Sequence, residues 1–195
     1  HPSFRASTID ALEDAVGVHL GAQFVQMPVG KSEIDARANH FKLPNSGLWY
    51  CSYGIPVALR FPEPDHIRVQ FNHAGIGATW IAAILIPINA RQACISTTAA
   101  EIDFSPGFEQ IVWRIPKAVM VRKLAGMMDC AVTSALDFDP LLDLATPQAA
   151  TLMRILDCLV HAADTVCGEA ADVVRFDFEQ SMITAFVAAG DHGCR

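Results

Sequence analysis

The spacing of apolar residues changes once along this chain, at Pro116, and this change limits the folds open to it. Residues 108–115 alternate in the way of a β-strand with one buried face. Pro116 suits the first position of a helix, and beyond it the apolar residues recur at helical spacing up to Met128. The sequence therefore predicts a β unit at residues 1–115, followed by a helical unit at residues 116–195.

Short strands separated by glycine and proline turns are expected throughout the first unit. The pattern is clearest at residues 66–72, where Ile67, Val69 and Phe71 alternate with polar residues. A helix or an extended arm is expected at residues 4–20. About eight short strands with such turns are typical of a β-sandwich or a small barrel. The other expected strands are residues 33–43, 48–53, 57–61, 78–86, 92–97 and 108–115.

Two further helices are expected in the second unit. One begins at Thr146-Pro147, where a hydroxyl cap precedes a proline. The last, at residues 169–189, carries two apolar stripes, which is more than one neighbouring element requires. Both stripes could pack on the β unit and the preceding helix. The alternative places a homodimer contact on one stripe, at Phe178, Met182 and Phe186.

Composition and charge argue against several classes of protein. The chain has 195 residues, 52% of them hydrophobic, which is enough for a sizeable core. Its formal net charge of −7 argues against direct contact with nucleic acid. The longest apolar run, near residues 80–88, is interrupted by Pro87 and is too short to span a membrane. With no leader pattern, and six cysteines without a Cys-x-x-Cys pair, we expect a cytoplasmic protein with reduced thiols.

No catalytic constellation is recognisable in the sequence. The common nucleophile, zinc-protease and phosphate-loop motifs are missing. His66 and His73 do not have the spacing of the paired histidines in a metal-binding cupin. Carboxylates near Asp103 and Asp139 flank turns and helix starts, where capping explains them. We therefore expect no catalytic residue, metal ion or cofactor, and we keep a metal-dependent cupin-type enzyme as an alternative.

Polar and aromatic residues on otherwise apolar strands are the candidates for a binding site. Such a face could line a pocket with apolar walls and a few fixed hydrogen-bond donors, as small-molecule sites do. Each of these residues could also simply face water on an antiparallel sheet. The candidate ligand-binding residues are Tyr50, Arg60, Arg68, Gln70, Asn72 and Trp80.

Two motifs resemble the AraC-binding-like N-terminal domain of AraC/XylS-type bacterial transcription regulators. The first is the step Arg114-Ile115-Pro116, and the second is Phe138-Asp139-Pro140-Leu141-Leu142-Asp143-Leu144. The opening Phe4-Arg5 and the strand end Tyr53-Gly54 also fit. The resemblance implies an α+β fold in which a cupin-like antiparallel β-barrel binds an effector and a following helical hairpin dimerises. DNA would be read by a C-terminal helix-turn-helix domain, which we expect outside this chain.

The resemblance implies a small-molecule effector, which could be an aromatic acid, a fatty acid or a cyclic dinucleotide. An aromatic acid needs one arginine in an apolar pocket, and Arg60 or Arg68 could serve. A cyclic dinucleotide favours paired arginines on a flexible arm, and Arg5 lies on such an arm as a further candidate. Our main hypothesis is an effector-sensing and dimerisation domain without catalytic activity. A dimerisation module without a ligand is the other alternative.

Overall fold

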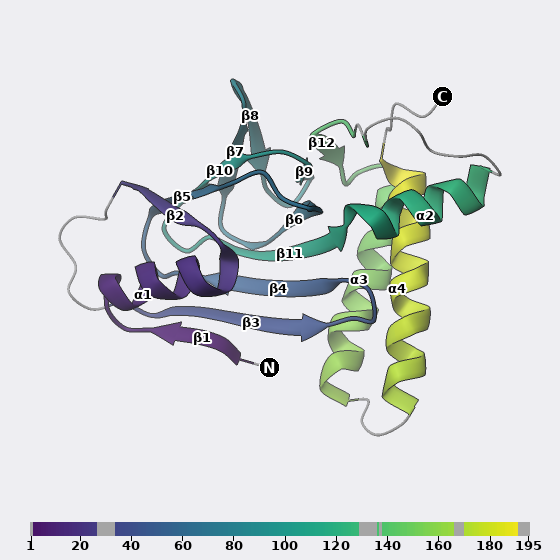
Figure 1. The fold of residues 1–195 in the computed structure, drawn as a ribbon, viewed down its shortest axis with the longest axis horizontal. Helices are drawn as coiled ribbons and strands as arrows, with labels where there is room; N and C mark the ends of the chain where they lie inside the picture. The colour runs from purple at the N-terminus through teal and green to yellow at the C-terminus, as the bar shows by residue number, and fades with distance from the viewer. Residues whose placement is uncertain (1, 27–33, 129–135, 137, 166–169, 191–195) are drawn as a thin grey trace.

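The structure, a computed structural model, combines two antiparallel sheets with helices that pack on one of them (Figure 1). The larger sheet is called sheet A and the smaller sheet B. The description covers residues 2–26, 34–128, 136, 138–165 and 170–190.

Among these residues, seven strands form sheet A and five form sheet B. The sequence led us to expect a barrel, but the strands pair in two separate sheets that face each other across a shared core. The order in sheet A is β1 (Pro2–Ala6), β3 (Ala36–Lys42), β4 (Gly47–Ser52), β11 (Glu109–Pro116), β6 (His66–Ala74), β9 (Gln92–Ser96) and β12 (Leu141–Asp143). The order in sheet B is β2 (Gln23–Gln26), β5 (Val57–Phe61), β10 (Ala100–Phe104), β7 (Gly77–Ile81) and β8 (Ile84–Ile88).

An apolar core fills the layer between the two sheets. Alternate residues of strands in both sheets point into it, and Ala38 of β3 and Leu59 of β5 are fully buried there. Helix α1 (Ile9–Ala15) and the π-helical turn η1 (Val16–Leu20) add to this core, with Leu12 as a fully buried contact. The N-terminal segment is therefore part of the folded layer.

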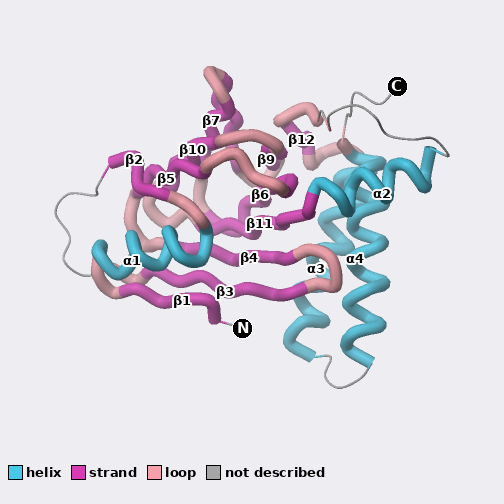
Figure 2. The backbone as a smooth tube through the Cα atoms, in the orientation of Figure 1, coloured by secondary structure: helices cyan, strands magenta, loops and turns pink. Residues whose placement is uncertain are grey.

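A second core lies on the opposite face of sheet A, where helices α2 (Lys117–Met128), α3 (Pro147–Thr165) and α4 (Ala170–Ala189) pack. Figure 2 shows these helices gathered beside the sheet, with α3 and α4 side by side. Leu156 of α3 and Phe186 of α4 are buried in the same core as the apolar residues of the sheet. Because each such side chain contributes about 2 kcal/mol on burial, the helices and sheet A are firmly joined.

Strand β11 lies at the centre of sheet A, paired with β4 on one side and β6 on the other. Its pleat sends successive side chains to opposite faces of the sheet. Trp113 points to the helices, with its ring 5.8 Å from that of Phe186. Arg114 points into the layer between the sheets, where its guanidinium lies over the Trp49 ring. One strand therefore contacts both cores.

The predicted change from strand to helix at Pro116 is confirmed, because β11 ends at Pro116 and α2 begins at Lys117. The single strand expected at residues 78–86 is wrong, because this segment forms the hairpin of β7 and β8. Ala82, with φ of 53°, allows the sharp turn between them. Strand β10 was missed, although its buried residues Ile102 and Phe104 alternate with acidic ones.

The apolar stripe assigned to a homodimer contact is buried within the chain itself. Met182 and Phe186 are 0% exposed, and the half-buried Phe178 packs against the same core. Sheet A has an apolar face on the helix side that must be covered, and this stripe covers it. The assignment of these three residues to a contact with a second copy is therefore corrected in favour of packing within one chain.

Glu179 of α4 is a buried carboxylate held by the turn between β3 and β4. It accepts hydrogen bonds from the backbone amide of Asn45 at 3.0 Å, the side-chain amide of Asn45 at 2.9 Å and the hydroxyl of Ser46 at 2.6 Å. The Ser46 hydroxyl in turn accepts from the Trp113 indole at 3.0 Å. Because these donors replace the water lost on burial, they fix α4 to sheet A and connect it with β11.

Replacing Glu179 by alanine should lower the free energy of unfolding by about 2–4 kcal/mol, because the donors of Asn45 and Ser46 would be left unpaired. Urea denaturation of the variant measures this loss. Asp177→Ala on the exposed side of the same helix is the control and should change stability little. Equal stability of the two variants would show that Glu179 does not fix the helix.

Candidate functional site

A row of polar side chains from β6 and β11 points into the layer between the sheets. The apolar residues of β6 face the helices, so Arg68 and Gln70 face the opposite way and are 2% and 0% exposed. On β11, Gln110 and Arg114 share this face, opposite Asn72 and Arg68 in the strand pairing. Burying a polar group costs free energy unless it has a hydrogen-bond partner, so the cost of burying each of these side chains depends on its partners.

Gln70, Gln110 and Thr79 satisfy one another in a hydrogen-bond network. The Gln70 amide donates to Gln110 Oε1 at 3.0 Å, and the Thr79 hydroxyl donates to Gln70 Oε1 at 2.9 Å. Thr79 belongs to sheet B, so the network joins the two sheets across the layer. A satisfied network of this kind fixes how the sheets sit on each other. We interpret Gln70 as a cross-link between the sheets.

Arg68 and Arg114, called the arginine pair below, are direct partners on the paired strands β6 and β11. Such partners have Cβ atoms about 5 Å apart on one face. The Arg68 guanidinium lies 4.3 Å from the centre of the Phe61 ring, and that of Arg114 lies 5.1 Å from the centre of the Trp49 ring. Arg68 also donates to Ser96 Oγ at 3.3 Å. The Nε atoms of both arginines are buried without a hydrogen-bond partner.

The surroundings of the arginine pair supply no compensating negative charge. In the described part of the chain, neither guanidinium has a carboxylate within ion-pair distance. Burial raises the pKa of the Cys51 thiol to about 11 and that of the Cys94 thiol to about 12, so both stay neutral at pH 7. Burial, and then the charge of Arg114, lowers the pKa of Arg68 to about 9. Two adjacent cations in a water-poor layer are unfavourable by themselves.

His66 marks the place where the arginine pair approaches solvent. It lies one pleat before Arg68 on β6, and its side chain is 20% exposed. Its Nδ1 is 3.0 Å from the Asp65 carboxylate, and its Nε2 is buried without a partner. Burial lowers the pKa of His66, Asp65 raises it, and Arg114 and Arg68 lower it further. The pKa of His66 therefore responds to the charge at the arginine pair.

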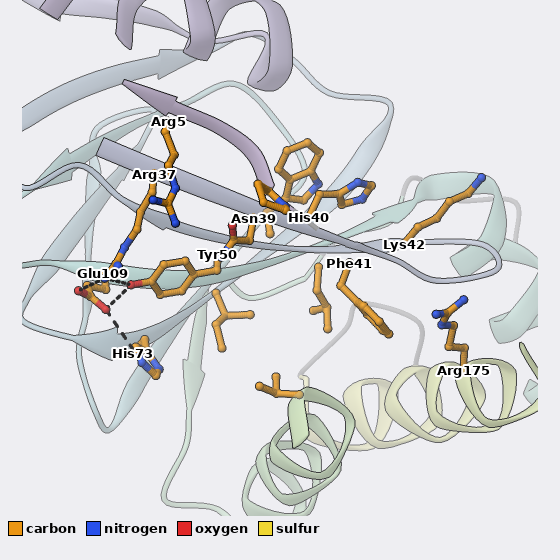
Figure 3. Close-up of a pocket in the computed structure, with 15 residues that line it drawn as sticks. Arg5, Arg37, Asn39, His40, Phe41, Lys42, Tyr50, His73, Glu109 and Arg175 are labelled. Carbon is orange, nitrogen blue, oxygen red and sulfur yellow. Dashed lines mark hydrogen bonds and ion pairs between the residues drawn. The ribbon is translucent and has the colours of Figure 1, made fainter. Parts of the chain in front are cut away.

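The structure distributes the predicted ligand-binding residues over several places. Arg68 and Gln70 lie between the sheets, as described above. Arg5 and Tyr50 line a groove of about 1050 Å³ on the opposite face of sheet A (Figure 3). Asn72 serves a turn, because its side-chain amide donates to the carbonyls of Ala74, at the end of β6, and Gly75, just after it.

Arg60 and Trp80 belong to sheet B and point away from the layer between the sheets. The Arg60 guanidinium lies 3.3 Å from the Glu101 carboxylate, with its side chain 64% exposed. The Trp80 indole donates to the Asp103 carboxylate at 3.0 Å, and the residue is 39% exposed. The structure does not bring these two residues together with the arginine pair.

Arg114 and His66 belong to the site but were not among the predicted binding residues. The sequence shows that Arg68 is polar on an apolar strand, but it does not show which residue lies opposite. That residue depends on the pairing of β6 with β11, which are separated by several other strands in the chain. In the sequence, Arg114 stands out only as part of the Arg114-Ile115-Pro116 motif, whereas the strand pairing makes it half of the arginine pair.

Two negative observations apply to the described residues. No group of three or more His, Cys, Asp and Glu side chains in this part of the chain is arranged to hold a metal ion. No helix among these residues is long and apolar enough to cross a membrane. The two histidines considered at the sequence level lie on opposite faces of sheet A, with His66 beside the arginine pair and His73 in the groove.

The arrangement of two sheets with helices on one face is shared with an AraC-like protein. The crystal structure of the AraC-like transcriptional activator CuxR matches with a TM-score of 0.66 and 11% identity, over 100% of this chain and 73% of that chain. A predicted oxalate decarboxylase from Thermotoga maritima matches with a TM-score of 0.37 and 12% identity, over 59% of this chain and 91% of that chain. The match to CuxR shows that the fold is that of an AraC-like protein.

The family assignment follows from the sequence as well. Residues 15–187 match the AraC-binding-like domain, and the chain belongs to this family. The resemblance expected from the Arg114-Ile115-Pro116 step and the Phe138–Leu144 motif is therefore confirmed. No curated protein matches the sequence.

Replacing Arg68 by methionine should raise the free energy of unfolding at pH 7 by about 1–3 kcal/mol, because it removes an unneutralised buried charge at similar volume. The folded-state pKa of Arg68 is lowered to about 9, so this unfavourable contribution is complete below pH 9 and decreases as the pH rises further. Urea denaturation at pH 7 measures the difference.

Arg60→Met on the exposed face of sheet B is the matched control, since its ion pair with Glu101 is exposed and contributes little. A loss of stability in Arg68→Met larger than in the control would contradict this account. Arg68 would then be a structural residue that the fold requires.

Proposed function

We propose that this domain senses a small organic acid, whose carboxylate binds the arginine pair in the layer between the sheets. The observation that carries the proposal is a pair of arginines at directly paired strand positions, Arg68 buried and Arg114 half-buried, without an anionic partner among the described residues. A bound carboxylate would accept hydrogen bonds from the unpartnered Nε atoms of Arg68 and Arg114 and would neutralise charge where water is scarce. In the free protein the two positive charges repel each other, and a bound anion reduces this repulsion.

The body of the effector is expected to be aromatic or compactly apolar. The rings of Phe61 and Trp49 flank the guanidiniums, and buried apolar residues such as Leu59 continue the layer. A site with apolar walls and a few fixed donors selects such a molecule by shape and fixes its orientation by charge. Among the effector classes considered at the sequence level, an aromatic acid fits best.

Family membership supports a regulatory role for this binding. In the proposal, the chain is the sensing part of an AraC-type transcription regulator in the cytoplasm, dimerises through its helices and acts on DNA through another domain. No catalytic residue, metal ion or cofactor is assigned to it. Sedimentation equilibrium tests the dimer: a monomer at all accessible concentrations, with and without the effector, would remove dimerisation from the proposal.

Strand β11 provides a route by which effector binding would change the position of helix α4. Arg114 would contact the effector, and the next residue along the chain, Trp113, lies in the helix-side core. Trp113 donates to Ser46, which donates to Glu179 of α4. A shift of β11 on effector binding would therefore reach α4 through these partly buried hydrogen bonds, which tolerate little stretching. Effector binding changes the position of α4 only if the effector has a higher affinity for one arrangement of β11 and α4 than for another.

Benzoate should raise the thermal unfolding midpoint of the wild-type domain, because a ligand that binds the native state stabilises it by about 2.7 kcal/mol at 100 times its Kd. Arg68→Met and Arg114→Gln should abolish the shift. Arg154→Gln on the exposed surface of α3 should retain it. Benzamide, which has the same ring without the charge, should give no shift in any variant.

The pKa of His66 gives a second measurement of the same event. Because Arg114 and Arg68 lower this pKa, an anion bound between them should raise it. Titration of the histidine ring by NMR, with and without benzoate, measures the change. If several aromatic and aliphatic carboxylates leave both the midpoint and the pKa of His66 unchanged, the proposed effector site is wrong.

A further inference from the structure

The groove on the helix side of sheet A is formed by segments far apart in the sequence. Strands β1, β3, β4, β6 and β11 supply its floor, and helices α3 and α4 supply Val160 and Arg175 at its rim. In Figure 3, Arg37 reaches Glu109 with Arg5 beside it on the neighbouring strand, while Arg175 reaches from α4 toward Phe41. The volume of about 1050 Å³ is large enough for a small organic ligand.

The charge of the groove is opposite to that of the chain. The chain as a whole carries a formal charge of −7. The residues that line the groove include four arginine or lysine side chains, Arg5, Arg37, Lys42 and Arg175, against one carboxylate, Glu109. A concave surface lined mainly by one sign of charge concentrates the electrostatic potential and attracts the opposite charge. The groove is therefore suited to an anion.

Glu109 is already engaged at one end of the groove. It accepts a 2.5 Å hydrogen bond from the Tyr50 hydroxyl, and its other oxygen lies 3.7 Å from Arg37. Arg37 also donates to the Tyr50 hydroxyl at 3.3 Å. Glu109 thus neutralises Arg37 and has little capacity left for the other cations.

Arg5 is a cation of the groove without a carboxylate partner in the described part of the chain, whereas Arg175 is paired with Asp172 at 3.2 Å. It is the direct partner of Arg37 in the pairing of β1 with β3, so two like charges stand opposite each other on one face. Such an arrangement is unfavourable unless an anion lies between the two. Among the described residues, Arg5 has no hydrogen-bond or ion-pair partner.

The other end of the groove is apolar and aromatic. Arg175 lies with its guanidinium 5.3 Å from the centre of the Phe41 ring. Leu48, Ile111 and Val160 also line the groove. A ligand that fits both ends has an anionic group at Arg5 and Arg37 and an apolar body that extends toward Phe41 and Arg175.

We propose that this groove is a second ligand site, separate from the arginine pair, and that it binds a phosphate ester with an aromatic body. A phosphate group presents three oxygens around one phosphorus, so it can accept from two guanidiniums that approach from adjacent strands. A phosphate monoester carries a charge of about −1.5 to −2 at pH 7, against −1 for a carboxylate, so it offsets more of the positive charge in the groove. The two sites lie on opposite faces of sheet A, and ligands at both would contact neighbouring residues of β11 and β4.

Isothermal titration calorimetry with 1-naphthyl phosphate tests the proposal. We expect one-to-one binding to the wild-type chain and a loss of affinity of about tenfold or more in Arg5→Gln/Arg175→Gln, because this variant removes the charge-assisted contact of Arg5 with the phosphate and the guanidinium that borders the apolar end of the groove. Arg154→Gln, an exposed arginine of α3 outside the groove, is the matched control and should bind like the wild type. Inorganic phosphate and 1-naphthol should each bind more weakly than the ester.

The pattern across variants separates this proposal from the sensing function. Arg68→Met should leave the affinity for 1-naphthyl phosphate unchanged, and Arg5→Gln/Arg175→Gln should leave the response to benzoate unchanged. No binding of the ester, or equal binding by wild type and the groove variant, would overturn the groove site. A loss of ester binding in Arg68→Met alone would also overturn it, because the ester would then occupy the layer between the sheets.

Discussion

The structure depends on strand β11, which is hydrogen-bonded along both edges and contributes to both cores. Its pleat places Arg114 between the sheets and Trp113 against α4, so adjacent residues belong to the candidate effector site and to the contact with the helices. The effector site and the helices are therefore connected through one strand, without a loop or hinge between them. A displacement of the strand would change both sides at once, because packed interiors transmit small shifts.

The arginine pair and Glu179 show two ways in which this fold treats buried charge. Glu179 is surrounded by donors from Asn45 and Ser46, and its charge is satisfied within the chain. Arg68 and Arg114 have aromatic rings and one hydroxyl near them but no carboxylate among the described residues. Satisfied charge fixes the helix to the sheet, whereas unsatisfied charge costs stability and marks a place for a ligand.

Periodicity predicted much of the fold and part of the candidate site. The junction at Pro116 and the inward position of Arg68 follow from alternation along single strands, which is a local property. Which sheet a strand joins is not local, so Arg60 and Trp80 showed the same polar signal as Arg68 but lie on the outer side of sheet B. For the same reason the stripe containing Met182 could not be assigned, because its partner is a sheet face built from distant segments.

The central claim is that the arginine pair holds an anion, and a crystal of the domain grown with 4-bromobenzoate tests it most directly. Anomalous scattering locates the bromine atom without assumptions about the ligand's position. The account predicts a bromine peak in the layer between the sheets, with the carboxylate in hydrogen-bond contact with Arg68 and Arg114. Bromine peaks confined to the groove or to the outer surface, with the arginine pair unchanged, would contradict it.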